Sequence, residues 1–248
     1  MAPPRVVLKA SEVAAILGKN PYKPRQEVFD ELWKKYSPET FSGKTKRDRA
    51  EEALRASVAA QSVLTSALSV KAENSEHVQK VFAEAKAVIN SDSKLNETQK
   101  AEVIEHLRSK VYTTHGTRSE NKTSDKVATE QNIRLVKDNS FYNYEVCTLG
   151  ETKFVVTGKI DRIEEREDGS RILVEIKNRT NRLFRRVVEY EFIQVQVYLQ
   201  MLGLVHARLV EQYNNQVLSH DVSRDEELWI NEIVPGLETF CRELFEKF

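Results

Sequence analysis

The chain has 248 residues, of which 40% are hydrophobic and 31% charged, with 38 basic and 38 acidic side chains. Such a composition is typical of a globular protein with a sizeable core, and zero net charge gives no argument for a polyanionic partner. Two cysteines, Cys147 and Cys241, are too few for a disulfide framework or a zinc site. No apolar run could span a membrane, and "MAPPRVVLKASEV" lacks a signal-peptide core. We therefore expect an intracellular protein, cytoplasmic or nuclear, with no membrane partner.

The first 36 residues predict two helices joined by a turn. Ser11 is a suitable N-cap for a short helix that ends at Gly18. Pro21 and Pro24 mark the turn, and a second amphipathic helix is expected over residues 25–36.

A helical insertion is expected at about residues 43–112. Apolar side chains recur there at helical spacing, and the stretch contains no proline. The repeat is formed by Val78, Val81, Phe82, Ala85, Val88 and Ile89. Its role stays open between plain scaffold, an arch over a substrate channel, an oligomerisation surface and a partner dock.

Strand patterns begin at about residue 133. The segments "IRLV", "FYNYEVCTLG", "KFVVTGKIDRIEER" and "RILVEIKN" follow one another between turns, which predicts an antiparallel meander. A helix at about 187–204, a strand "ARLVEQYNN" and a closing helix at 225–248 follow. The order predicts an α/β (α+β) fold in which a central mixed β-sheet is flanked by helices. We expect one domain, residues 1–248, with its core at about 113–248.

The stretch "LVEIKNRT" places charges inside an apolar strand. Because strand side chains alternate, Val174 and Ile176 should point to one face while Leu173, Glu175 and Lys177 point to the other. A buried charge costs several kcal/mol unless it is paired or holds a metal. The pair is either a structural ion pair or part of a catalytic site.

Asp161 lies on the preceding strand, in "VVTGKIDRIEE", and a short hairpin would bring it beside Glu175. Adjacent carboxylates repel each other unless a cation lies between them, and Mg²⁺ or Mn²⁺ with oxygen ligands is the expected ion. Lys177 could then orient a water molecule for attack on a phosphodiester. The spacing of Asp, Glu and Lys is by itself a weak signal.

Other residues accompany this pair in a recognisable order. Glu120 follows Gly116 by four residues, and Tyr198 follows Gln194 by four on one helical face. The set Gly116xxxGlu120, Gly158xxAsp161, Glu175-Ile176-Lys177 and Gln194xxxTyr198 resembles the PD-(D/E)XK nuclease superfamily, in its RecB-like and lambda-exonuclease-like branch. The stretch "ASEVAAILGKNPYKPRQEVF" is similar to the opening of the YqaJ-type viral recombinase nucleases in that branch.

The resemblance implies a restriction-endonuclease-like core and a role for each motif residue. Asp161, Glu175 and the Ile176 carbonyl would bind the metal, and Glu120 would help to bind it or a second ion. Lys177 would position the nucleophilic water.

The remaining roles concern DNA. Gln194, with Tyr198, would support the site or hold the strand being cut. Ser11, with Arg5 or Lys9, would form a pocket for an end phosphate.

Basic and aromatic residues follow Lys177 closely in the sequence. Their arginines would contact phosphates, and their aromatic rings would stack on the bases of a frayed end. The residues are Arg179, Arg182, Arg185 and Arg186, with Phe184 and Tyr190. Phe184 has a core position as its alternative.

Several alternatives stay open at this stage. Glu120 could be a charge at a helix N-terminus, favoured by the helix dipole. Gln196 competes with Gln194, and His115 is more simply structural than catalytic. Ile160 stands where the family often has a proline, and the helical segment is longer than the family pattern leads us to expect.

The resemblance implies a metal-dependent deoxyribonuclease, most directly an exonuclease at duplex DNA ends in recombination or repair. A structure-specific endonuclease and a non-catalytic nucleic-acid-binding protein of the same fold are the alternatives. The implied partners are DNA, a single-strand annealing or binding protein and a second copy of the chain. A virus or mobile element is the implied source.

Overall fold

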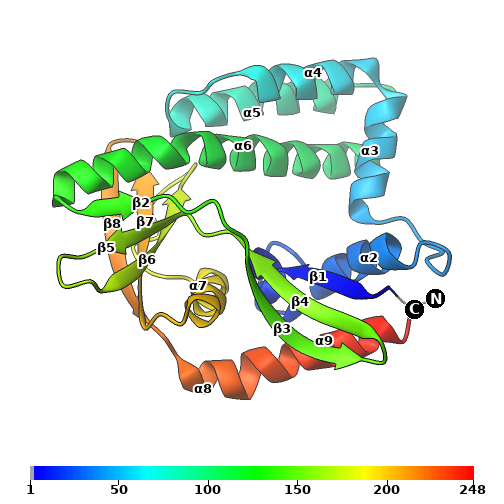
Figure 1. The fold of residues 1–248 in the computed structure, drawn as a ribbon. Helices are drawn as coiled ribbons and strands as arrows, with labels where there is room; N and C mark the ends of the chain where they lie inside the picture. The colour runs from blue at the N-terminus through cyan, green and yellow to red at the C-terminus, as the bar shows by residue number, and fades with distance from the viewer. Residues whose placement is uncertain (1–2) are drawn as a thin grey trace.

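The computed structural model describes residues 3–248, which form two mixed sheets surrounded by helices (Figure 1). The strands are β1 (Arg5–Lys9), β2 (Arg134–Val136), β3 (Tyr142–Leu149), β4 (Thr152–Gly158), β5 (Arg162–Glu165), β6 (Arg171–Asn178), β7 (His206–Tyr213) and β8 (Gln216–Ser223). The α-helices are α1 (Val13–Ile16), α2 (Arg25–Tyr36), α3 (Lys46–Ala56), α4 (Val58–Ser69), α5 (Ser75–Ser91), α6 (Glu97–Gln131), α7 (Glu189–Leu202), α8 (Glu226–Leu228) and α9 (Val234–Phe245). A 3₁₀ turn (Ala10–Glu12) precedes α1, and a π-helical turn (Trp229–Ile233) joins α8 to α9.

The larger sheet has the order β2-β5-β6-β7-β8, in which only β6 and β7 run parallel. The smaller sheet has the order β1-β4-β3, with β1 parallel to β4. A mixed α/β fold flanked by helices is thus confirmed.

The expected single meander is divided in two. The segment "KFVVTGKIDRIEER" forms β4 in one sheet and β5 in the other, and the chain leaves the first sheet after Gly158. A Cβ atom at Gly158 would overlap the Tyr198 ring and the side chain of Ala10. Glycine therefore lets the strand end press against α7 at the point where the chain changes sheets.

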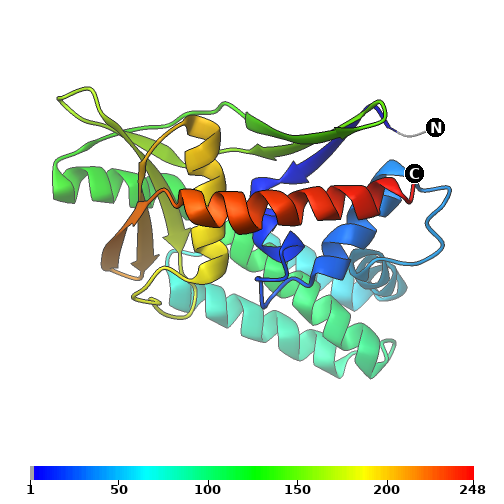
Figure 2. The same cartoon turned by 90° about the horizontal axis from the view of Figure 1, so that it is seen from below.

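Helix α7 lies between the two sheets and contacts β3, β6 and β7 (Figure 1). Seen from below, α9 runs across this face of the molecule, where it packs on β3 (Figure 2). Phe154, Ile193, Leu199 and Phe240 are fully buried in the core that these elements share. Because α7 packs on both sheets, its side chains can reach residues from either one.

Strand β6 has the predicted alternation. Leu173 lies in the main core beside α7, whereas Val174 and Ile176 pack with Val127 and Val210 under the C-terminal half of α6. Glu175 and Lys177 therefore share the α7 face of the strand.

The helices α3, α4, α5 and the first half of α6 form a small bundle with its own core. In Figure 1, α3 leads from α2 to the other three helices of the bundle. Ion pairs from Lys46 to Glu105 and from Arg49 to Glu102 join α3 to α6. The expected helical segment is confirmed, but α6 runs unbroken through residue 112, so the insertion and the core share one helix.

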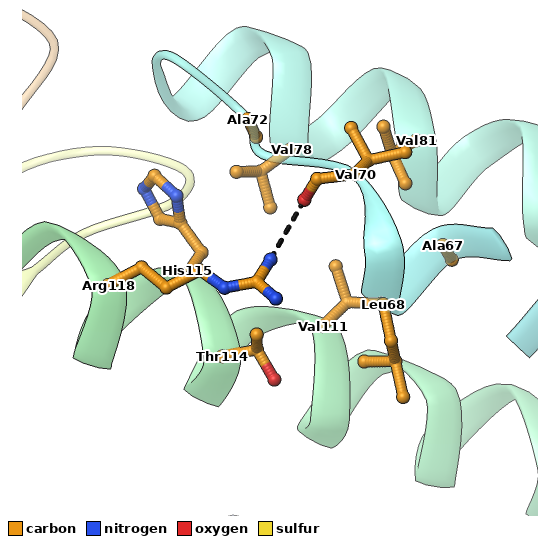
Figure 3. Close-up of a pocket in the computed structure, with 10 residues that line it drawn as sticks. All are labelled: Ala67, Leu68, Val70, Ala72, Val78, Val81, Val111, Thr114, His115 and Arg118. Atoms are coloured by element: carbon orange, nitrogen blue, oxygen red, sulfur yellow. Dashed lines mark hydrogen bonds between the residues drawn. The ribbon is translucent and has the colours of Figure 1, made fainter. Parts of the chain in front are cut away.

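A small cavity lies between α6 and the α4–α5 connection (Figure 3). Its walls are mainly apolar, with Val78 and Val111 among them, and Arg118 donates a hydrogen bond to the Val70 carbonyl at 3.0 Å. The volume of about 20 Å³ has room for one water. His115 borders it, and burial lowers the pKa of its imidazole.

The N-terminal expectations are met only in part. Helix α2 has the predicted bounds, but Ser11 lies exposed inside the 3₁₀ turn, and α1 begins without a side-chain cap. The assignment of Ser11 as an N-cap is wrong because the turn before α1 already contains it. Across residues 3–248, no helix combines the length and apolar character needed to cross a membrane.

Candidate active site

Two carboxylates meet where the sheets adjoin. Asp161 sits just before β5, and its Oδ2 accepts a hydrogen bond from the backbone N–H of Ile176 at 2.7 Å. This bond ties Asp161 to β6 next to Glu175, because the hairpin register pairs Arg162 with Val174. The predicted proximity of Asp161 and Glu175 is confirmed.

Lys177 and Gln194 complete a hydrogen-bonded cluster around Glu175. The Lys177 ammonium donates to Glu175 Oε1 at 2.9 Å and to Gln194 Oε1 at 3.0 Å. The Gln194 amide in turn donates to Glu175 Oε1 at 3.1 Å and to the Tyr198 hydroxyl at 3.2 Å. Strand β6 and helix α7 thus orient one another's polar groups, as the spacing of Gln194 and Tyr198 predicts.

Burial and neighbouring charges shift the pKa values of Asp161 and Lys177. Burial, and next the charge of Glu175, raise the pKa of Asp161 to about 8, while the Ile176 N–H acts against this shift. Burial alone would lower the pKa of the Lys177 ammonium, but the negative charges of Glu175 and Glu191 outweigh it and raise that pKa. The side chain of Glu175 is 5% exposed and that of Lys177 20%. With both carboxylates ionised, the site would hold more negative charge than one ammonium neutralises.

One oxygen of Glu175 has the character of a ligand atom. Glu175 Oε2 is buried and finds no hydrogen-bond partner within the described part of the chain, an arrangement that costs free energy. A divalent cation beside Asp161 and Glu175 would satisfy this oxygen and relieve the repulsion between the carboxylates. The residues therefore fit a hard metal ion, although residues 3–248 bring no three His, Cys, Asp or Glu side chains together as a preformed cluster.

Glu120 does not join the two carboxylates. It lies inside the 35-residue helix α6 rather than at a helix start, so both the expected start and the helix-dipole explanation are wrong. Its Oε1 accepts a hydrogen bond from Arg162 at 2.6 Å, and the same guanidinium nitrogen donates to the Asp161 carbonyl at 2.5 Å. Glu120 therefore acts on Asp161 through Arg162, and its charge adds to the raised pKa of Asp161.

Gln194, and not Gln196, contacts the carboxylate cluster. Gln196 points away from the carboxylates, where its amide donates to the Ser223 carbonyl and accepts from the Asp225 N–H. It is buried rather than on the surface, and it ties α7 to the end of β8.

Arg179 belongs to a second, structural network. Its guanidinium donates to both carboxylate oxygens of Glu191, at 2.5 and 2.8 Å, and to Glu211 at 2.8 Å. It also lies over the Phe184 ring at 4.0 Å. Since the group is buried and engaged on both sides, the structure gives Arg179 no free face for a phosphate, contrary to the expectation from sequence.

The N-terminal residues are not part of the cluster. Arg5 and Ser11 are exposed, and Arg5 donates to Asn143 at 3.1 Å. Lys9 pairs with Glu12 at 3.1 Å. None of the contacts of these three residues reaches Asp161 or Glu175, so an end-phosphate pocket here stays a prediction.

Two residues near the site escaped the sequence analysis. Arg162 follows Asp161 directly and is held by Glu120, Asn121 and Ser124 on α6. Asn178, just after Lys177, donates to the Gly116 carbonyl at 3.1 Å and accepts from Thr123 at 2.6 Å. Their adjacency to the predicted ligands was the available signal.

Comparison with known proteins places the chain in a family. The sequence pattern of the PD-(D/E)XK nuclease superfamily matches residues 23–232. No curated protein gives a significant match.

Solved structures with a related arrangement have low sequence identity. An alkaline exonuclease from Laribacter hongkongensis is 17% identical over 78% of this chain and 92% of its own, with a TM-score of 0.41. A phage-related exonuclease from Haemophilus somnus 129PT is 12% identical over 97% and 95%, with a TM-score of 0.43. A protein named SSO0001 is 15% identical over 74% and 85%, with a TM-score of 0.43. The sequence match spans most of the chain, and the chain belongs to the PD-(D/E)XK nuclease superfamily.

Proposed function

We propose that this protein is a magnesium- or manganese-dependent deoxyribonuclease, most directly an exonuclease that hydrolyses phosphodiester bonds at the ends of duplex DNA. The observation that supports this most strongly is the pairing of half-buried Asp161 with buried Glu175 beside Lys177, with Glu175 Oε2 left without a partner. A purely structural ion pair is expected to satisfy both oxygens of its carboxylate.

The cation would be held by oxygen atoms that this corner of the fold supplies. Asp161, Glu175 and the Ile176 carbonyl are the proposed ligands, and Glu120 keeps Asp161 in place through Arg162. When bound, a divalent cation supplies a Lewis acid for the phosphoryl oxygen and the leaving group.

Lys177 and Gln194 position the reacting groups and stabilise charge. Lys177 uses two of its three N–H bonds on Glu175 and Gln194, so the third can donate to the attacking water or to a phosphate oxygen. Its positive charge stabilises the negative charge that develops in the transition state. Gln194 keeps both Glu175 and Lys177 in position by bonding to each.

The test is digestion of end-labelled linear duplex DNA with Mg²⁺, compared with EDTA. We expect cleavage of the linear duplex with Mg²⁺ alone, no cleavage by Lys177→Ala, and wild-type cleavage by Lys80→Ala, whose side chain is 75% exposed on α5. Activity that survives Lys177→Ala would contradict the assigned site.

A closed circular duplex separates exonuclease from endonuclease. An enzyme that needs an end leaves the circle intact, whereas robust cutting of the circle would favour the structure-specific endonuclease. For a role in recombination or repair, a single-strand annealing or binding protein would take the strand exposed at a resected end.

A further inference from the structure

We propose that a basic and aromatic groove at the N-terminal end of α7 binds the single-stranded DNA that leads into the active site. This inference rests on the proposed function and names where the strand lies. The groove is formed by the α1–α2 connection, the loop at 179–188 and the end of the β7–β8 hairpin. Its main lining residues are Tyr22, Arg182, Arg185, Arg186, Tyr190 and Tyr213.

A buried carboxylate holds the 179–188 loop in shape. Glu211 on β7 is completely buried and accepts the backbone N–H groups of Phe184 at 2.7 Å and Arg185 at 3.0 Å. It also binds the Arg179 guanidinium, and His220 lies 2.8 Å from its other oxygen. The side chains that this loop presents therefore sit on a fixed backbone.

The loop is also tied to the helical insertion. On α5, Ser75 donates to the Arg179 carbonyl at 2.8 Å, and Gln79 donates to the Thr180 carbonyl. Contacts from β7, from α5 and, through Glu191, from α7 thus hold a segment that has no regular secondary structure of its own.

The arginines of the loop point outward and are not neutralised. Arg182, Arg185 and Arg186 are exposed, and none forms an ion pair within residues 3–248. Arg185 has a φ of 57°, in the left-handed region that costs a non-glycine residue free energy. Three guanidinium groups without ion-pair partners on one loop suit a chain of phosphates, and the acidic residue that also lines the groove, Glu189, is paired with Lys19 at 3.2 Å.

Aromatic rings that line the same groove provide surfaces for bases. Tyr22 is 67% exposed, and its ring meets that of Tyr190 edge-on with centroids 5.7 Å apart. An exposed ring held in place by a second ring is suited to stacking on an unpaired base, whatever the base. Phe184 is less available because Arg179 covers its face.

The groove and the active site share one stripe of α7. Tyr190, Gln194 and Tyr198 are spaced by four residues and lie on the same face of the helix. Tyr190 is one turn, about 6 Å along the axis, from Gln194, which binds Glu175 and Lys177. A strand whose scissile phosphate lies at Lys177 would thus continue over Tyr190 into the groove.

The test measures binding of fluorescein-labelled oligothymidylate, ten nucleotides long, in EDTA across a range of salt concentrations. Each phosphate contact contributes about 0.7 to the slope of log K against log salt for a single strand. We expect Arg182→Gln combined with Arg186→Gln to weaken binding about tenfold and to lower the slope by about 1.4. Arg171→Gln combined with Arg242→Gln, two exposed arginines on β6 and α9, should leave both quantities unchanged.

A second variant tests the aromatic ring of Tyr22 separately. Tyr22→Ala should weaken binding at an unchanged salt slope, and Tyr22→Phe should bind like the wild type. An unchanged slope in the double arginine variant would overturn the proposal, as would the absence of any oligonucleotide binding at low salt.

The two proposals fail in distinguishable ways. Loss of slope in a protein that cuts no DNA supports the groove and refutes the nuclease. Cleavage with an unchanged slope supports the nuclease and refutes the groove.

Discussion

Two charged networks, one around Lys177 on β6 and one around Arg179 in the loop after it, lie close together in the sequence. They differ in whether every buried polar atom has a hydrogen-bond partner. Around Arg179, the guanidinium and two buried carboxylates satisfy one another, with backbone N–H groups filling the remaining positions on Glu211. Around Lys177, one ammonium faces Asp161 and Glu175, and one buried oxygen stays without a partner. We expect the Arg179 network to stabilise the fold, whereas the Lys177 network keeps a buried oxygen without a donor at the place where chemistry is proposed.

The largest expected effect comes from removing one charge of the incomplete network. Asp161→Asn should lower the rate of Mg²⁺-dependent cleavage by about 10³-fold, or ~4 kcal/mol in activation free energy, because a metal ligand and its charge are lost. Initial rates on end-labelled duplex DNA measure this, with circular dichroism to confirm the fold. A rate within tenfold of wild type would mean that Asp161 is not a ligand.

Removing a member of the complete network should instead damage the fold. Arg179→Ala leaves Glu191 and Glu211 buried without their counter-charge, so we expect the free energy of unfolding to fall by about 3 kcal/mol. Urea unfolding measures the change. The matched control is Arg242→Ala, whose 63% exposed side chain on α9 should change stability by no more than about 0.5 kcal/mol. Equal stability of the two variants would contradict a structural role for Arg179.

The raised pKa of Asp161 predicts that the stability of the metal-free protein depends on pH. The folded state keeps this proton up to a pKa of about 8, whereas the unfolded chain releases it near 3.8. The resulting stabilisation is fully present below pH 3.8 and is lost as pH rises through 8. In EDTA, we expect the wild type to lose a few kcal/mol more of its free energy of unfolding than Asp161→Asn between pH 5 and pH 8.5.

Thermal unfolding of both proteins at the two pH values checks this difference. Mg²⁺ at pH 8.5 should raise the melting temperature of the wild type and leave Asp161→Asn nearly unchanged. Parallel pH profiles of the two proteins would show that Asp161 is already compensated.

The smallest effect is expected at the bracing residue. Glu120→Gln keeps a hydrogen-bond acceptor for Arg162 but removes one negative charge, so cleavage should fall by about tenfold rather than vanish. The rate, measured against Mg²⁺ concentration, separates weaker metal binding from slower chemistry. A loss as large as that of Asp161→Asn would make Glu120 a direct ligand.

Local patterns were enough to predict much of this fold. The bounds of α2, the alternation along β6 and the pairing of Gln194 with Tyr198 follow from helical and strand periods alone. The division into two sheets could not be predicted, because it depends on Gly158 meeting a ring forty residues further along the chain.

The predictions of a helix boundary at Gly116 and of a phosphate contact for Arg179 were wrong for similar reasons. Glycine is poor inside a helix, so Gly116 suggested a boundary, yet packing carries α6 straight through it and Asn178 bonds to its carbonyl. The destination of Arg179 depends on Glu191 and Glu211, which reach it from two other elements. Sequence spacing revealed which residue types belong together, but competition between nearby partners decided which contacts form.

The unbroken course of α6 has a mechanical consequence. One end of the helix carries Val103 and Leu107 in the core of the insertion, and the other carries Val127 under the large sheet. A lid would need a hinge between these two anchors, and bending there would sacrifice backbone hydrogen bonds of the helix. We therefore expect the insertion and the large sheet to move as one rigid body. A partner that binds the bundle and displaces α6 would then also displace Asn178, which bonds to α6 and lies one residue from Lys177.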